Sequence, residues 1–125
     1  MRINVAEEVK KRYGDKCFEE IYEYIKDLIL EKPDSKVIDR LMFIKKLFSN
    51  KTRASILILL SQAALPVCAL VSVLNVDQTL VSHNLSALKK LGIVKEERIR
   101  RYRVYSLDKE RLKRILQNAI SAILT

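Results

Sequence analysis

Residues 74–94 read L-N-V-D-Q-T-L-V-S-H-N-L-S-A-L-K-K-L-G-I-V, and the predicted fold is organised around this stretch. Asp77 is a favoured N-cap residue, and Gly92 stands where a helix would end in a left-handed C-cap. The helical spacing from Gln78 to Leu91 places an apolar stripe on one face, which can dock onto a core: Val81, Leu85 and Leu88, flanked by Leu80 and Leu91. The stretch therefore predicts an amphipathic helix over residues 78–91.

The opposite face of this predicted helix carries short hydrogen-bonding side chains with a cation at the far end. They are Gln78, Thr79, Ser82, His83, Ser86 and Lys89. Ordinary surface helices are richer in Glu and Lys, whereas these groups are the kind that read base edges and hold phosphates. We interpret the stretch as a helix that lies in the major groove of DNA, with a plain surface helix as the alternative.

The pattern changes from helix to strand after Gly92. Two β-prone runs, Val94–Arg98 and Tyr102–Leu107, are joined by Ile99-Arg100-Arg101, which predicts a hairpin without the usual glycine at its tip. Its arginines suit contacts with a phosphate backbone or the minor groove: Arg98, Arg100, Arg101 and Arg103. A solvated, charged hairpin is the alternative.

The charge of the chain is uneven as well as positive. The sequence has 24 basic and 15 acidic residues, a net charge of +9. Residues 89–114 hold eleven cations and four carboxylates, so seven of the nine excess charges lie there. This balance favours a polyanionic partner. No apolar run reaches the ~18 to 20 residues that cross a bilayer, and the start lacks a secretory pattern, so we expect a cytoplasmic protein without a membrane partner.

A length of 125 residues with two Gly and two Pro indicates one mostly helical domain. We expect a short helix over 4–12, a break at Gly14 and a longer helix over 15–30. These form an N-terminal helical extension, residues 1–34. The DNA-binding domain, residues 35–125, would then begin with a helix over 36–48, capped by Asp34 or Ser35. That helix is apolar on nearly every side, which points to a partner subunit.

The remaining helices complete this predicted domain. Ser49 or Asn50 caps a helix that ends near Ser61 or Gln62, and a short helix runs from Pro66 to Leu74. A tight turn follows at Asn75, a residue that tolerates positive φ. Asp108 caps a last helix to about Leu124, with a wide apolar stripe: Leu112, Ile115, Leu116, Ala119, Ile120, Ile123 and Leu124. This stripe is the predicted dimer seam, and two-fold symmetry would match a palindromic operator.

Residues 76–94 closely resemble the recognition helix of the ArsR/SmtB-type winged helix-turn-helix repressors, L-S-Q-S-T-V-S-H-H-L-x-x-L-x-x-A-G-L-V. The matching positions are Gln78, Val81, Ser82, His83, Leu85, Leu88, Gly92 and Val94. Upstream, a second set resembles L-x-x-P-T-R-x-x-I-L-x-x-L, with Asn50-Lys51 where Asp-Pro is common: Leu47, Lys51, Thr52, Arg53, Ile56, Leu57 and Leu60. The resemblance covers roughly residues 44–120, and the first forty residues have no counterpart in it.

The resemblance implies a mainly α winged helix-turn-helix with a small β-hairpin wing, dimeric through its terminal helices, that represses transcription. The expected major-groove residues are Gln78, Thr79, Ser82, His83 and Ser86. The expected phosphate contacts are Thr52, Arg53, Lys89, Arg100 and Arg101. The alternative is a winged-helix module that docks a protein and has only non-specific DNA affinity. His83 is the only histidine and no catalytic constellation surrounds it, so we expect neither an enzyme nor a cofactor.

Many members of that family sense metals. Their thiol site uses C-V-C where this chain has Pro66, Val67 and Cys68, so one thiol of two remains. Their terminal-helix site uses Asp and His, where this chain has Lys109, Arg111, Ala122 and Thr125. We therefore expect no metal site. Cys17 and Cys68 could still meet and sense thiol chemistry or a thiophilic ion, although two small buried hydrophobes are the commoner outcome.

Overall fold

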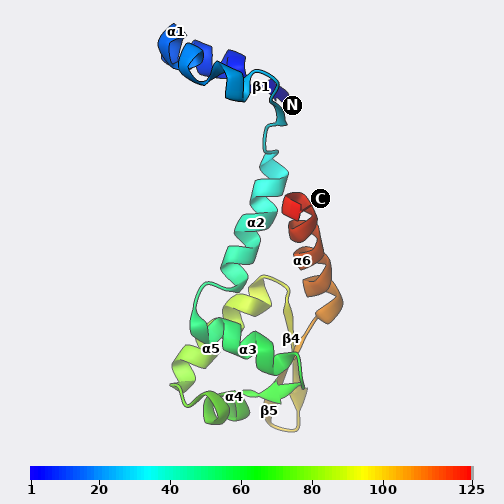
Figure 1. Cartoon of the computed structure of the whole chain (residues 1–125). Helices are drawn as coiled ribbons and strands as arrows, with labels where there is room; N and C mark the ends of the chain where they lie inside the picture. Colours follow the sequence, from blue (N-terminus) through cyan, green and yellow to red (C-terminus); the bar gives the residue numbers. More distant parts are fainter. Residues whose placement is uncertain (125) are drawn as a thin grey trace. The chain divides into compact units, whose positions relative to one another are not determined.

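The computed structural model describes residues 1–124 and divides into two compact units, Met1–Ile38 and Asp39–Thr125. Figure 1 shows the order of the elements along the chain. Thr125, one of the four terminal-helix positions compared above, lies outside the described residues. No helix within residues 1–124 is both long and apolar enough to span a membrane.

The first unit holds one kinked helix and two short strands. Helix α1 (Val5–Ile25) begins at Asn4, whose side chain accepts a hydrogen bond from the backbone N–H of Glu7 at 3.2 Å. Gly14, with φ 78° and ψ −172°, interrupts the helix as predicted. The prediction was wrong beyond Ile25, because β2 (Ile29–Glu31) is a strand that pairs antiparallel with β1 (Arg2–Asn4). Apolar residues at helical spacing cannot reveal a strand partner 27 residues away.

Helix α2 (Ser35–Leu47) follows Pro33, and the Asp34 carboxylate accepts a hydrogen bond from the Lys36 N–H at 2.8 Å. Leu47 is buried, while Met42 and Phe48 are exposed. An apolar side chain in water loses the stabilisation that burial provides, about 1.5–3 kcal/mol for a large one. This exposure agrees with the expectation that a partner subunit covers α2.

The second unit continues with four helices and a three-stranded sheet. The helices are α3 (Lys51–Leu60), α4 (Val67–Leu74), α5 (Gln78–Lys90) and α6 (Lys109–Leu124). The strands β3 (Leu65–Pro66), β4 (Val94–Ile99) and β5 (Tyr102–Leu107) form an antiparallel sheet in the order β3-β5-β4. Strand β3 was not predicted, and Pro66 is the N-cap residue of α4 rather than its first helical residue. The predicted caps Asn50 and Asp108 are confirmed, since each side chain accepts a backbone N–H, from Arg53 and Arg111 respectively.

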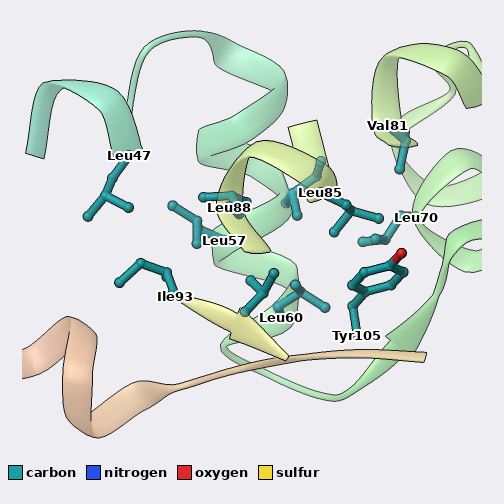
Figure 2. Packing of buried hydrophobic residues seen from close by; sticks show 11 residues of the cluster. Leu47, Leu57, Leu60, Leu70, Val81, Leu85, Leu88, Ile93 and Tyr105 are labelled. Carbon is teal, nitrogen blue, oxygen red and sulfur yellow. The ribbon is translucent and has the colours of Figure 1, made fainter. Parts of the chain in front are cut away.

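The core of this unit lies between α3, α5 and the sheet (Figure 2). It contains Leu47, Ile56, Leu57, Leu60, Leu70, Val81, Leu85, Leu88, Ile93, Val94 and Tyr105. The predicted apolar face of α5 is confirmed, because Val81, Leu85 and Leu88 are all fully buried. Leu80 is 42% exposed and does not belong to that face, contrary to the prediction. Burying one face of α5 leaves its polar face toward solvent.

Helix α6 packs only its inner side on this core. Leu112 and Ile115 contact the core, whereas Ile120, Ile123 and Leu124 are exposed. Side chains of α2 and α6, including Phe43 and Ile115, line an open hollow of about 340 Å³ between these two helices. Of the stripe predicted as a dimer seam, only the last part, Ile120, Ile123 and Leu124, is therefore uncovered in the single chain, whereas Ala119 is buried.

Candidate nucleic-acid interface

A tight turn joins α4 to α5. Helix α4 ends at Asn75, which adopts the left-handed conformation (φ 52°, ψ 49°) that asparagine tolerates better than most residues. Asp77 is extended and occupies the predicted N-cap position of α5, but its carboxylate makes no capping hydrogen bond. Gly92, with φ 75°, follows the helix as predicted. The turn at Asn75 and the glycine at position 92 thus lie on either side of α5, as predicted.

The predicted base-reading side chains lie on the solvent face of α5. Gln78, Thr79, Ser82, His83 and Ser86 are all exposed, and so is Lys89 at the far end of the helix. Such a row of donors and acceptors can meet base edges if the helix enters a major groove.

A hollow of about 320 Å³ lies between α5 and the hairpin. Its lining residues come from both elements and from the start of α4: Val67, Gln78, Ser82, Ser86, Lys89, Glu96, Arg103 and Tyr105. Three of the predicted base-reading residues therefore share one concave surface with two cations.

Glu96 contacts both cations that line this hollow. Its carboxylate lies 2.6 Å from Lys89 Nζ and 3.5 Å from Arg103 Nε, and it accepts a hydrogen bond from the Tyr105 hydroxyl at 2.9 Å. The hydrogen bond from Lys89, followed by that from Tyr105, lowers the pKa of Glu96. Burial, followed by the hydrogen bond to Glu96, raises the pKa of Tyr105. Glu96 stays ionised and Tyr105 stays neutral at physiological pH.

Sequence reasoning did not select Glu96 or Tyr105. Their signal was present in the strand pattern, because they are direct cross-strand partners in the hairpin and so share one of its faces. A lone acidic side chain on the cationic face of a hairpin is a candidate organiser of those cations.

The tip of the hairpin is a two-residue turn, Arg100-Arg101, closed by the pair Ile99 and Tyr102. Arg100 has φ 58°, a conformation that usually belongs to glycine or asparagine. The Arg101 guanidinium lies 5.4 Å from the centroid of the Tyr102 ring, a cation–π distance. Both arginines are exposed, so the tip presents two cations to solvent.

Thr52 and Arg53 differ from the other predicted contacts. Thr52 is half-buried and lines a small hollow with Lys51, Ser55, Leu74 and Val76. Arg53 is only 9% exposed, and its guanidinium donates to Asn84 and to the Lys46 carbonyl. We therefore do not keep the assignment of Arg53 to phosphate contact.

Asn84 is a further residue that sequence reasoning missed. It is fully buried on α5. Its signal was its position, three residues after Val81 and four before Leu88, which puts it on the apolar face. A polar side chain on a buried face needs partners, and those partners are Arg53 and Asn50.

The two thiols are free and belong to different units. Cys17 is half-buried in α1, and Cys68 is exposed in the first turn of α4, so neither is a fully buried hydrophobe. In the part of the chain described, no group of three or more His, Cys, Asp or Glu side chains could hold a metal ion.

An exposed polar helix, set by a tight turn on a shorter helix and flanked by an arginine-tipped hairpin, defines a winged helix-turn-helix protein. The family model described as bacterial regulatory protein, arsR family, matches residues 50–96. An uncharacterized HTH-type transcriptional regulator of Methanocaldococcus jannaschii is 36% identical over 73 residues, which cover 58% of this chain and 82% of that protein. The chain therefore belongs to the ArsR family of regulatory proteins.

Two further proteins show how far the similarity extends. The HTH-type transcriptional regulator NmtR of Mycobacterium tuberculosis is 32% identical over 87 residues, covering 70% of this chain and 72% of NmtR. The solution structure of the homodimeric winged helix-turn-helix DNA-binding domain Mb0332 of Mycobacterium bovis has a TM-score of 0.56 and 27% identity. The similarity covers 74% of this chain and 86% of the Mb0332 chain. About a quarter of the present chain thus has no counterpart in that domain.

Proposed function

We propose that this protein is a homodimeric, sequence-specific regulator of transcription that binds double-stranded DNA and acts as a repressor without catalysis. One observation carries the proposal: the hydrogen-bonding side chains of α5 are exposed while its apolar face is buried in the core. A helix held in this way can enter a major groove without rearrangement of the domain.

The proposed contacts divide by chemistry. Base edges would be read by side chains of α5: Gln78, Thr79, Ser82, His83 and Ser86. Phosphates would be held by Thr52, Lys89, Arg100 and Arg101, and these contacts would supply most of the salt-dependent binding free energy. The excess of seven positive charges in residues 89–114 supports this division.

A homodimer is supported by the exposed apolar residues of α2 and α6 and by the similarity to the homodimeric Mb0332 domain. We propose that residues 35–125 form the DNA-binding domain with its dimerisation helix, and residues 1–34 an N-terminal extension. Two-fold symmetry would present two copies of α5 to one palindromic operator. Repression is proposed from the resemblance to the ArsR/SmtB-type repressors, and the cytoplasm is the proposed location.

The test is a selection of duplexes from a random-sequence library with the full chain, followed by affinity measurements. We expect nanomolar binding of the selected duplex and an affinity for a scrambled duplex weaker by about 10³-fold or more at the same salt concentration. Uniform, salt-sensitive micromolar binding of all duplexes would instead favour a protein-docking module with incidental DNA affinity.

A further inference from the structure

Arg53 and Asn84 meet inside the second unit, away from solvent. Arg53 Nε donates a hydrogen bond to Asn84 Oδ1 at 3.1 Å. Within residues 1–124, these two are the buried members of the polar and charged residues. Buried polar groups are costly unless they are satisfied, so their presence in a core of leucines and isoleucines calls for a reason.

The donors around Asn84 leave its amide one orientation. The backbone N–H of Arg53 donates to Asn50 Oδ1 at 2.8 Å, so Asn50 turns its Nδ2 to Asn84 Oδ1 at 3.1 Å. Arg53 Nε and Asn50 Nδ2 can only donate, and Asn84 Oδ1 accepts from both. Asn84 Nδ2 then donates to the Leu80 carbonyl one turn back at 2.9 Å. The side chain of Asn84 is thereby fixed to α5 at one end and to α3 at the other.

Arg53 extends this network to α2. Its Nη1 donates to the carbonyl of Lys46 at 2.6 Å, and Lys46 lies in the last turn of α2. Carbonyls in the last turn of a helix have no partner within the helix, and a cation there also complements the helix dipole. One guanidinium therefore caps α2 and holds α5.

We infer that Arg53 and Asn84 are a positioning pair for sequence reading, which sets the rotation of α5 about its axis relative to the end of α2. Successive helix residues lie about 100° apart around the axis, so a modest rotation would turn Ser82 and His83 away from the base edges they face. The apolar face of α5 alone tolerates small rotations, because leucine contacts are non-directional. The hydrogen bonds to Asn84 are directional and supply the missing constraint.

The inference rests on the proposed function and is tested on the same two duplexes, the one selected by the wild-type chain and its scrambled counterpart. The readouts are the ratio of the two dissociation constants, the slope of affinity against salt concentration, and the thermal unfolding midpoint. The variants are Arg53→Lys, Asn84→Leu, and Arg53→Met combined with Asn84→Leu.

Arg53→Lys keeps the charge, but one ammonium cannot reproduce the fork that reaches both Asn84 and Lys46. We expect the ratio of dissociation constants to fall about tenfold, comparable to the loss of one base contact, with scrambled-duplex affinity and salt slope unchanged. Asn84→Leu should lower the ratio similarly and also lower the unfolding midpoint, because it strands the buried Arg53 donor. The double variant should regain much of that midpoint, since no buried donor is left unpaired, yet keep the low ratio.

Three outcomes would overturn the inference. The first is a wild-type ratio in Arg53→Lys. The second is equal weakening on both duplexes with a flatter salt slope, which marks a phosphate contact. The third is full recovery of the ratio in the double variant, which marks a role in stability alone. Failure of the proposed function is distinguishable, because the wild-type chain would then select no preferred duplex.

Discussion

The Lys89 ammonium lies 2.6 Å from the Glu96 carboxylate, so a cation of α5 is paired with the first strand of the hairpin. Arg103 of the second strand shares the same carboxylate at 3.5 Å. Glu96 therefore draws both elements together but also places a negative charge on a surface proposed to face phosphates. In the proposed complex, phosphates would compete with Glu96 for these two cations.

Glu96→Gln should strengthen binding to selected and scrambled duplexes alike, because it releases Lys89 and Arg103 to phosphates. We expect roughly fivefold tighter binding at low salt, in the range of an exposed ion pair, and a steeper salt slope. Glu97→Gln is the matched control, since it removes the same charge from the other face of β4. Equal effects of the two substitutions would show that the pairing at Glu96 is irrelevant and only net charge matters.

Acid should weaken the fold partly through Glu96. A carboxylate whose folded pKa is lowered stabilises the folded state above its unfolded pKa of about 4.3, and that stabilisation is lost as pH falls through the folded pKa. The thermal unfolding midpoint should therefore drop between neutral pH and pH of about 3 by less in Glu96→Gln than in wild type. An identical drop in the two proteins would assign the acid sensitivity to other groups.

Replacing Arg100 and Arg101 together with Ala should weaken binding to every duplex by a similar factor. These exposed side chains contact phosphates in the proposed complex, so the slope of log affinity against log salt should flatten by up to about two. Fluorescence anisotropy over a series of salt concentrations measures this slope. An unchanged slope would remove the hairpin tip from the interface.

Gln78→Ala and Ser82→Ala should chiefly lower discrimination between sequences. Each lost base contact is expected to cost about 1–3 kcal/mol on the selected duplex and little on the scrambled one. Both residues are exposed on α5, so the unfolding midpoint should stay close to that of wild type. Equal losses on both duplexes would place these side chains on the backbone instead.

Cys68 should react with thiol reagents faster than Cys17, because Cys68 is exposed and Cys17 is half-buried. If Cys68 senses thiol reagents, the alternative considered above, modification will also change DNA affinity in wild type and not in Cys68→Ser. Mass spectrometry follows the reaction, and anisotropy follows the binding. Full modification of Cys68 without a change in DNA affinity would show that this residue does not act as a sensor.

Substituting Gly92 with Ala should lower the unfolding midpoint. Gly92 adopts φ 75°, and a Cβ built there would lie 2.8 Å from Nη1 of Arg111. We expect a loss of about 1–2 kcal/mol from the left-handed backbone conformation, with a smaller addition because the Arg111 side chain can move. Calorimetry of Gly92→Ala beside Arg111→Ala/Gly92→Ala separates the two causes. An unaltered midpoint in the single variant would contradict the assignment.

Much of the second unit was predictable because its signals are local. The periodicity of α5, the asparagine turn before it and the glycine after it each specify a conformation within a few residues. The same holds for the caps at Asn50 and Asp108. The family resemblance then supplied the arrangement of these elements.

The missed features all depend on distant partners. Strand β2 forms only because β1 lies beside it, and β3 only because β5 offers a free edge. Arg53 matched a motif position that suggested phosphate, yet its geometry is decided by Asn84, 31 residues later in the chain. Glu96 looked like one acid among many cations until the hairpin register put Tyr105 opposite it.

Arg100 holds a left-handed backbone conformation at the tip of the hairpin. A glycine would adopt that φ without strain and could make the domain harder to unfold, but it would remove a positive charge from the end of the hairpin. If Arg100 contacts a phosphate as proposed, a glycine at this position would raise the thermal stability of the domain and weaken its binding to DNA.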